Sequence, residues 1–144
     1  ISMMPALTSL IARETGPKAM AKAGISHDDI DLTMIYDSFT YTVMLTLESL
    51  GFCARGEAAD FVANQRTAPG GDFPLNTAGG GLSYTHPGMY GSFLLVEAVR
   101  QLRGEAGARQ VHKKGTTDQN PQISLVNGTG GSLSSTGTVV LGTG

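Results

Sequence analysis

Residues 76–91 read NTAGGGLSYTHPGMYG and combine three consecutive glycines with a His-Pro pair a few residues later. Glycine has no side chain, so residues 79–81 offer bare backbone that a ligand can approach closely. Proline is favoured at the first position of a helix, so His86 is predicted to lie at the start of a helix that opens at Pro87. The helix dipole there favours a neutral histidine, which can donate a hydrogen bond to a carbonyl that gains negative charge. A histidine that only caps a helix is the competing interpretation.

A second candidate segment, residues 35–39 (IYDSF), joins a predicted strand to a predicted helix. The apolar run 32–36 is typical of a buried strand, and the helix predicted over 38–50 follows it directly. Open α/β sheets hold ligands where the carboxyl end of a strand faces the N-terminus of a helix. The alternative interpretation is that Asp37 or Ser38 acts only as the N-cap of the helix.

The third candidate segment, residues 127–132 (NGTGGS), lies between strands predicted over 123–126 and 137–141. A Gly-rich connection of this kind is most often a wide turn. The chain has no Walker A pattern, and no G-x-G-x-x-G sequence follows a strand and opens a helix, so nucleotide binding is not indicated. Cys53 follows the helix over 38–50 and is predicted to be a packing residue rather than a nucleophile.

Helices alternate with strands along the chain, which predicts an α/β layer sandwich formed by a single domain over residues 1–144. Residues 1–14 are expected to cover this domain, and the polar residues 105–122 to form a mobile loop. The first helix is predicted to start at residues 15–17 (Thr-Gly-Pro) and to end at Gly24. The next two helices, over 38–50 and 87–102, are predicted to bury apolar stripes formed by Phe39, Val43, Leu47 and Leu50 and by Met89, Phe93, Val96, Val99 and Leu102.

The composition excludes several classes of function. With a net charge of −2 and Lys113-Lys114 as the one basic pair, the chain lacks the charge pattern of a nucleic-acid-binding protein. Its single cysteine excludes an intrachain disulfide and a cysteine-based zinc site, and fits a cytoplasmic protein. No apolar run approaches the ~20 residues of a membrane-spanning helix. His27 and His112 are predicted to lie at the surface, and the start at Ile1 suggests a piece of a longer protein.

The three candidate segments, in this order, resemble the C-terminal half of the thiolase superfamily over residues 16–142. Tyr36-Asp37-Ser38-Phe39 stands where biosynthetic and degradative thiolases have Asn-Glu-Ala-Phe and sterol-carrier-protein-type thiolases have His-Asp-Cys-Phe. Thr85-His86-Pro87 resembles the Gly-His-Pro motif, whose histidine lies in the thioester oxyanion hole. The third family motif, Cys-x-Gly-Gly-Gly, falls on residues 128–132, so Gly128 replaces the cysteine that acts as acid and base in Claisen chemistry.

The resemblance implies a mixed five-stranded sheet covered by helices, one of two pseudo-equivalent halves of a five-layered α/β sandwich. The other active-site cysteine of the family belongs to the N-terminal half, which these residues do not include. A retained oxyanion-hole histidine without the Claisen base is similar to the actinobacterial lipid-transfer-protein branch, the thiolase-like aldolases of steroid side-chain breakdown. Those proteins cleave a β-hydroxyacyl-CoA by a retro-aldol reaction and work with an OB-fold partner that carries a zinc ribbon.

On this resemblance His86 holds the thioester oxygen, and Tyr36 and Tyr90 are the groups suited to move protons. Acyl-CoA is the expected substrate, with no metal and no cofactor beyond its coenzyme A. The expected partners are the thiolase-like N-terminal half, a second copy of the full-length protein and the OB-fold subunit. The alternatives are a sterol-carrier-type thiolase and a non-catalytic acyl-CoA-binding subunit, and the 144 residues alone are expected to be inactive. The expected substrate-binding residues are Asp37, Asn76, Gly79, Gly80, Gly81, Gly128 and Gly130.

Overall fold

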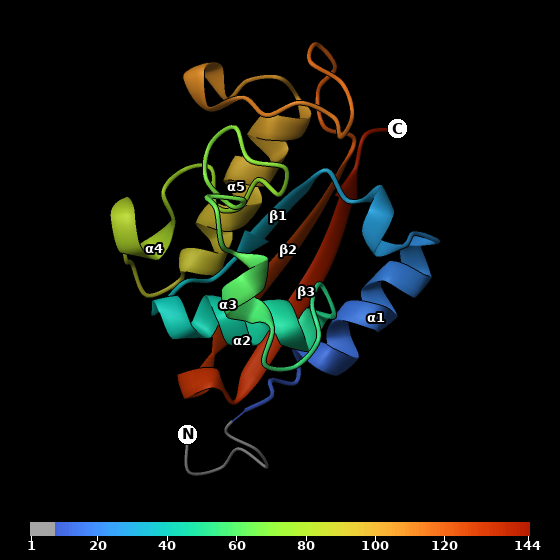
Figure 1. The fold of residues 1–144 in the computed structure, drawn as a ribbon. Coiled ribbons are helices and arrows are strands. Elements are labelled where there is room, and N and C mark those ends of the chain that lie inside the picture. Colours follow the sequence, from blue (N-terminus) through green and yellow to red (C-terminus); the bar gives the residue numbers. More distant parts are fainter. Residues whose placement is uncertain (1–7) are drawn as a thin grey trace.

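A computed structural model describes residues 8–144, which form a mixed β-sheet with helices on both faces (Figure 1). The sheet has the strand order β1-β2-β3, with β1 at Leu32–Ile35, β2 at Ile123–Gly130 and β3 at Ser135–Gly142. β1 and β2 run parallel, whereas β2 and β3 are antiparallel in one unbroken register. The three predicted strands are therefore confirmed, and β2 runs on beyond its predicted end at Val126.

The predicted five-stranded sheet is wrong for the residues that the structure describes, because residues 8–144 contain three strands. On the outer side of β1, the segment before Asn76 comes alongside and makes a single bridge between Thr33 and Leu75. The pairing ends there because Asn76 takes a left-handed backbone with a φ of 50°. Its side-chain amide then bonds to both the N–H and the C=O of Ile35, at 2.9 and 2.8 Å, where a strand backbone would otherwise pair.

Five α-helices and three short 3₁₀ turns connect these strands within the described residues. α1 and α2 cover one face of the sheet and α5 covers the other (Figure 1). Successive side chains of a strand point to opposite faces, so Met34 packs with α5 whereas Ile35 packs with α1 and α2. The helices are α1 Ala12–Ala23, α2 Thr40–Leu50, α3 Ala58–Phe61, α4 Gly80–Ser83 and α5 Tyr90–Leu102, and the 3₁₀ turns are His27–Asp29, Gly107–Arg109 and Gly131–Leu133.

α1 begins at Ala12, so the predicted helix start at residues 15–17 is wrong, and Pro17 lies inside the helix. An interior proline costs ~3 kcal/mol because it removes a hydrogen bond and clashes with the preceding turn. Packing against α2 offsets this cost. Ala12, Gly16 and Met20 form one buried face, and Gly16 lies so close to α2 that an added Cβ would come within 2.7 Å of Leu50 Cδ2.

Glycines end the first two long helices as predicted. Gly24 and Gly51 take left-handed backbones, with φ angles of 68° and 87°, and their N–H groups bond back into the last turns of α1 and α2. The start of α2 lies at Thr40 rather than at Ser38. The sequence therefore located the ends of these helices better than their beginnings.

The apolar stripe predicted for α2 is confirmed at Leu47 and Leu50 and the one predicted for α5 at Leu102, whereas four of the nine predicted positions are exposed. Phe39 and Met89 are 70% and 79% exposed, and Phe93 and Val96 also face outward. Both helices carry apolar side chains around most of their circumference, so periodicity alone could not select the buried face. The buried positions are Thr42, Leu45, Thr46, Leu47, Ser49 and Leu50 in α2, and Tyr90, Leu94, Glu97, Ala98, Gln101 and Leu102 in α5.

Residues 105–122, predicted to form a mobile loop, are held to the start of β1 by Asp31. The Asp31 carboxylate accepts hydrogen bonds from the backbone N–H groups of Lys114, Gln122 and Ile123, at 2.8, 2.7 and 3.2 Å. The segment therefore lacks long regular elements but has fixed attachment points. Its mobility stays a prediction.

Cys53 and His27 lie outside the sheet, and the environment of each was predicted from the sequence. Cys53 is half-buried and packs against the core beneath α1 and α2, where burial raises the pKa of its thiol and the charges of Glu48 and Glu57 add to the effect. His27, predicted at the surface, is instead half-buried, with Nε2 at 2.9 Å from the Leu50 carbonyl oxygen. It therefore joins the turn before β1 to the end of α2.

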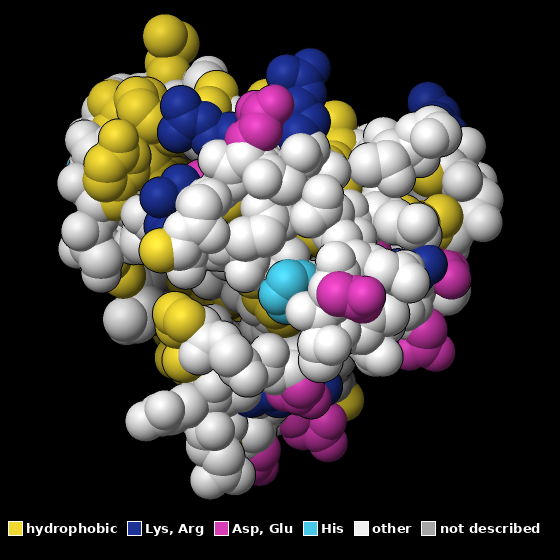
Figure 2. Space-filling model, turned by 90° about the horizontal axis from the view of Figure 1, so that it is seen from above, with side chains coloured by type: hydrophobic (Ala, Val, Ile, Leu, Met, Phe, Trp, Pro, Cys, Tyr) yellow, Lys and Arg dark blue, Asp and Glu magenta, His cyan; other side chains and the backbone are white. Residues whose placement is uncertain are grey.

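Large apolar side chains remain exposed on the outer side of α5 and next to it. Figure 2 shows hydrophobic side chains gathered at the upper left of one face, beside several Lys and Arg side chains. Monomeric proteins rarely leave a large continuous apolar surface uncovered, so a surface of this kind is suited to contact another protein. The exposed side chains near α5 are Leu82, Tyr84, Met89, Phe93, Leu95 and Val96.

We expect the isolated chain to self-associate through this surface, because contact between copies removes apolar area from water. Replacing Phe93 and Val96 together by lysine should shift the chain toward monomer in sedimentation velocity at micromolar concentration. Ala21→Lys, on the exposed side of α1, serves as the matched control and should leave the association unchanged. A wild-type chain that sediments only as a monomer would contradict the expectation.

Candidate functional site

A cleft of about 700 Å³ opens at the carboxyl ends of β1 and β2, between the first turns of α2 and α5. The strands end here, and the chain turns into the two helices from opposite faces of the sheet, so side chains from four segments converge. The cleft is lined by Tyr36, Ser38, Phe39, Tyr41, Thr42, Gly88, Met89, Tyr90, Gly91, Thr129, Gly130, Gly131 and Leu133.

The three residues predicted to be catalytic lie together at this cleft. The Tyr36 hydroxyl oxygen is 2.9 Å from His86 Nε2, within hydrogen-bond distance. The Tyr36 ring also lies 5.8 Å from the His86 ring and 5.8 Å from the Tyr90 ring, measured between centroids. Tyr36 follows the last residue of β1, His86 lies in the segment that leads into α5, and Tyr90 is the first residue of α5. The structure thus brings together residues 50 positions apart in the chain.

The Tyr90 hydroxyl is held in its protonated form. Burial raises the pKa of Tyr90 to about 12, and the negative charges of Asp37 and Glu97 add to the shift. Both Tyr36 and Tyr90 were predicted to transfer protons, but at neutral pH Tyr90 cannot act as a phenolate base. It can instead donate a hydrogen bond to a group that becomes negative.

His86 does not lie at the start of a helix. α5 begins at Tyr90 rather than at Pro87, so the predicted helix-dipole argument for a neutral His86 does not apply. What positions the exposed imidazole is its contact with the Tyr36 hydroxyl, together with the turn that leads up to it. The hydrogen bond can run in either direction, depending on which ring nitrogen carries the proton.

Asp37 holds the glycine turn rather than facing the cleft. Its carboxylate is 5% exposed and accepts hydrogen bonds from the N–H of Gly81 at 2.6 Å and of Leu82 at 3.2 Å. Gly80 passes so close that an added Cβ would lie 2.1 Å from Asp37 Oδ2, and its φ of 70° also favours glycine. The predicted contact of Asp37 with substrate stays a prediction, but in this structure Asp37 is a positioning residue.

The other members of the glycine motif also build the turn. Asn76 uses its amide to cap the edge of β1, and its carbonyl accepts a hydrogen bond from the Gly79 N–H at 2.8 Å. Gly79 has a φ of 101°, which supplies the change of direction. None of residues 76–81 is among the described residues that line the cleft. Their predicted substrate contacts are therefore untested, whereas their role in placing His86 is visible.

Gly128 and Gly130, the two glycines of the 127–132 segment that were predicted to bind substrate, lie in β2. Gly130 lines the cleft. Gly128 points toward the α5 side of the sheet, where an added Cβ would lie 3.8 Å from the Gly91 Cα. No side chain therefore occupies the place in which the family motif has its cysteine.

The cleft also contains residues outside the predicted site. From the sequence, Tyr41 could be either a core residue or a pocket wall, and the structure places it in the wall of the cleft. Sequence reasoning missed Thr42, in the first turn of α2, and Leu133, which follows the glycines at the end of β2. The signal that could have found Thr42 is its spacing of four residues from Ser38, which places both at the same end of the helix. No comparable signal marks Leu133.

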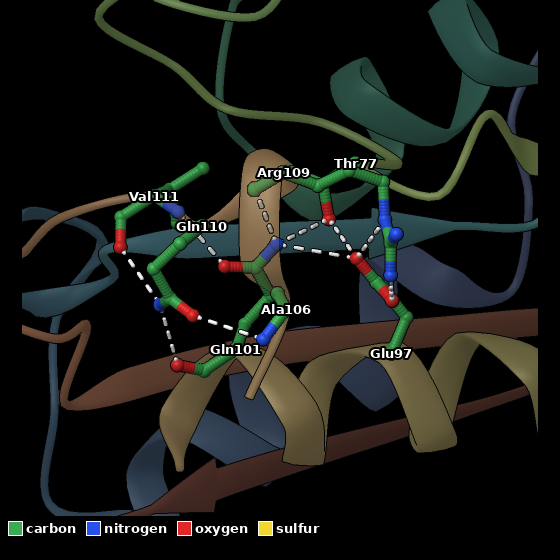
Figure 3. A network of polar contacts seen from close by, with 7 residues as sticks. All are labelled: Thr77, Glu97, Gln101, Ala106, Arg109, Gln110 and Val111. Carbon is green, nitrogen blue, oxygen red and sulfur yellow. Dashed lines mark hydrogen bonds and ion pairs between the residues drawn. The ribbon is translucent and has the colours of Figure 1, made fainter. Parts of the chain in front are cut away.

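A separate polar network anchors α5 to the segments on either side of it (Figure 3). The buried Glu97 carboxylate accepts hydrogen bonds from Thr77, from Gln101 and from Arg109, and the contact with Arg109 is also an ion pair at 2.9 Å. Gln101 lies between the two halves of the network and also bonds to the backbone of Arg109 and Val111. Burial raises the pKa of the Glu97 carboxyl, but these hydrogen bonds lower it by more, so the pKa lies below its ordinary value.

Comparison with known proteins shows the family of the chain. A family model described as thiolase C-terminal domain-like matches residues 1–143. The chain belongs to this thiolase family. The solved structure of the Ltp2-ChsH2(DUF35) aldolase superimposes with a TM-score of 0.80 at 33% sequence identity, covering 97% of this chain and 34% of that one. The predicted resemblance to the thiolase superfamily is confirmed.

Two curated relatives show which thiolase-like proteins are similar. The steroid side-chain-cleaving aldolase of Thermomonospora curvata is 47% identical over 91 residues, which are 62% of this chain and 22% of the relative. Human sterol carrier protein 2 is 38% identical over 102 residues, which are 70% of this chain and 19% of the relative. The matched part of this thiolase domain therefore spans only about a fifth of the length of either relative.

Two further observations concern metal binding and membrane spanning. In the part of the chain that the structure describes, no group of three or more His, Cys, Asp or Glu side chains is arranged to hold a metal ion. Among the helices of residues 8–144, none combines the length and the apolar character needed to cross a membrane.

Asp37→Asn should destabilise the domain by about 1–3 kcal/mol, because an amide can accept only one of the two backbone hydrogen bonds and leaves the other N–H unpaired. Urea unfolding measures the loss, and faster hydrogen exchange at Gly81 and Leu82 locates it. Asp118→Asn, at an exposed position, is the matched control. Unchanged exchange at the glycine turn would show that Asp37 does not hold it.

Acidification should weaken the domain partly through Glu97. Its folded pKa lies below the ordinary value of 4.5, so its contribution to stability is present above pH 4.5 and is lost as the pH falls through the folded pKa. The free energy of unfolding should therefore fall less between pH 6 and pH 3 in Glu97→Gln than in wild type, although the variant starts from a lower value. Glu105→Gln, at an exposed glutamate, should follow the wild-type profile, and identical profiles for all three proteins would contradict the assignment.

Proposed function

We propose that the full-length protein to which this domain belongs cleaves a carbon–carbon bond of a β-hydroxyacyl-CoA by a retro-aldol reaction. The observation that carries the proposal is the contact of Tyr36 with His86 at the cleft, while Gly128, which has no thiol, lies beside the cleft in β2. Claisen chemistry uses that thiol as acid and base, whereas a retro-aldol reaction needs a base for the substrate hydroxyl and a donor for the enolate. The name of the relative from Thermomonospora curvata supports the same class of reaction.

The reaction balances without an oxidant, a reductant or a covalent acyl-enzyme. The hydroxyl on the β-carbon loses its proton as the bond between the α- and β-carbons breaks. The β-carbon leaves as part of a ketone or aldehyde, and the electron pair of the broken bond becomes the enolate of the shortened acyl-CoA. A proton returned to the α-carbon completes the cleavage.

Tyr36 and His86 are placed to move the first proton. When Nε2 of His86 carries no proton, it can accept the Tyr36 proton while the Tyr36 oxygen takes the proton of the substrate hydroxyl, so no free phenolate is required. Tyr90 stays protonated because of its raised pKa, and it is suited to donate a hydrogen bond to the enolate oxygen. The competing role for His86, taken from the family resemblance, is to bind the thioester oxygen directly.

A sterol-carrier-type thiolase is the second candidate, and the similarity to human sterol carrier protein 2 favours it. Thiolytic cleavage of a 3-oxoacyl-CoA with free coenzyme A is the reaction to measure for this candidate. Gly128 argues against it, because a hydrogen atom cannot replace a thiol as acid and base. Acyl-CoA binding without either reaction would indicate a non-catalytic subunit.

The partners in this proposal follow from the exposed apolar surface. On the outer side of α5, a hollow of about 390 Å³ is lined by Tyr84, Phe93 and Val96 and bordered by Arg100 and Arg109. We propose that the thiolase-like N-terminal half of the full-length protein covers this side of α5. A second copy of the protein and an OB-fold subunit with a zinc ribbon are the further proposed partners.

The test is a double-mutant cycle in the full-length protein with its partner subunit. Tyr36→Phe and His86→Ala should each lower kcat for β-hydroxyacyl-CoA cleavage about 10²–10⁴-fold, the usual worth of general acid–base catalysis. If the two residues form one proton-transfer unit, the double variant should be no slower than the slower single variant, because such effects are not additive. If the two losses in kcat multiply in the double variant, the residues act independently, and His86 is instead assigned to the thioester oxygen.

His112→Ala is the matched control, because His112 is exposed and lines a different hollow at the other end of the sheet. It should leave kcat unchanged. Wild-type rates in both Tyr36→Phe and His86→Ala would refute the proposed mechanism. Melting temperatures close to that of wild type would show that the losses arise from chemistry rather than from unfolding.

A further inference from the structure

Thr129 lies near the end of β2, in the wall of the candidate cleft. Side chains alternate along a strand, so Thr129 shares a face of the sheet with Leu125, which packs with the residues of α1 and α2. Tyr90 reaches the cleft from the opposite face, where it packs with Val126. The cleft therefore has a wall on either side of the end of β2, with Thr129 in one and Tyr90 in the other.

The hydroxyl group of Thr129 has no hydrogen-bond partner among the described residues, although its oxygen is buried. The hydroxyl of Thr136, its direct partner across the strand pair, bonds instead to Asn127 and to the carbonyl oxygen of Gly128. A buried polar group without a partner lowers the stability of a fold. Valine has nearly the shape of threonine and is favoured in strands, so it would fill this position without that cost. Packing among the described residues therefore does not explain the hydroxyl.

Two other buried hydroxyls of the sheet, those of Thr33 and Ser124, also lack a partner among the described residues, but neither residue lines the cleft. Thr129 is half-buried, whereas Thr33 and Ser124 are 1% and 0% exposed. A threonine side chain turns about one bond between staggered positions, and such a turn exchanges the places of its hydroxyl and methyl groups. Of these three hydroxyls, only that of Thr129 can reach the cleft in this way.

Leu133 is a second residue of the cleft wall that lowers the stability of the fold. Its backbone is left-handed, with a φ of 74°, which is unusual for a bulky side chain. Costs of this kind gather at ligand sites, because a residue there is needed for what it contacts rather than for stability. Thr129 and Leu133 thus indicate independently that this wall of the cleft contacts a ligand.

The electrostatics of this wall favour a negatively charged group. The first turn of α2 also lines the cleft, and among the described residues it has neither a side-chain cap nor an acidic residue to offset the positive end of the helix dipole. The carboxylate of Asp37, which precedes α2, is bonded to the glycine turn. In the proposed reaction, negative charge develops on the enolate oxygen of the acyl-CoA, so this oxygen is the group that the wall suits.

We propose that the Thr129 hydroxyl donates a hydrogen bond to the enolate oxygen, as a second donor beside Tyr90. The inference rests on the proposed function and adds a residue to it. The proton stays on Thr129 throughout, so the balance of the cleavage is unchanged. The oxygen of the intact thioester carries less negative charge than that of the enolate, so the hydrogen bond strengthens as the carbon–carbon bond breaks. Thr129 therefore contributes to kcat rather than to substrate binding alone.

The experiment replaces Thr129 by valine and by serine in the full-length protein with its partner subunit. Thr129→Val removes the hydroxyl and should lower kcat for β-hydroxyacyl-CoA cleavage about 10²-fold with little change in KM, the usual effect of losing one donor to a developing oxyanion. Thr129→Ser keeps the hydroxyl and should cleave at close to the wild-type rate. The melting temperature of Thr129→Val should equal or exceed that of wild type, because no hydrogen bond between described residues is lost.

Thr33→Val is the matched control, because it removes a hydroxyl of the sheet that is also buried and without a described partner but lies outside the cleft. It should leave kcat unchanged, and its melting temperature should likewise not fall. If Thr129→Val fails to fold, Thr129→Ala carries the same test of kcat.

The failure of this inference can be distinguished from the failure of the proposed function. If wild type cleaves the β-hydroxyacyl-CoA and Thr129→Val keeps the wild-type kcat, whether or not KM rises, the hydroxyl does not bind the enolate oxygen and this inference alone is overturned. An equal loss of kcat in Thr129→Ser would assign Thr129 to packing and overturn the inference as well. If wild type does not cleave a β-hydroxyacyl-CoA, both the proposed function and this inference are overturned.

Discussion

The carboxylate of Asp37 connects the sheet to the part of the chain that carries His86. It follows Tyr36 at the end of β1 and takes two backbone hydrogen bonds from the glycine turn, across 44 and 45 positions of sequence. The position of the His86 imidazole beside the Tyr36 hydroxyl depends on that attachment, because the intervening residues form only one short helix, α4. The glycines of the motif follow from the same constraint, since a side chain at Gly80 would occupy the space of the carboxylate. In this structure the glycine motif therefore positions His86 beside Tyr36.

Local signals in the sequence were sufficient for the strands, for the glycines that end α1 and α2, and for the residues that meet at the cleft. They failed where the outcome depends on contacts that are distant in sequence. Pro17 lies inside α1 because Gly16 packs against Leu50, and no local rule contains that contact. The five-stranded sheet followed from family resemblance, whereas the pairing beside β1 stops where the amide of Asn76 takes the place of a strand. The role of Asp37 was likewise hidden, because its bonding partners became visible only in three dimensions.

Tyr36 and Tyr90 carry the same phenol group, but their different environments give the two hydroxyls different chemical properties. Tyr90 is 2% exposed and its hydroxyl keeps its proton, whereas Tyr36 lies at the edge of the cleft beside an exposed imidazole. One phenol is thereby suited to donate a hydrogen bond and the other to pass a proton on. In the proposed reaction, glycine at position 128, where the family motif has a cysteine, fits this division because proton transfer does not depend on β2.

The network around Glu97 has a consequence for how the domain is held together. One carboxylate holds Thr77, which precedes the glycine turn, and Arg109, which belongs to the segment after α5. Both segments bond to the same two side chains of α5, Glu97 and Gln101, so the two share one anchor. The buried Glu97 carboxylate therefore joins the segment after α5 to the segment that leads into the glycine turn without passing through the sheet.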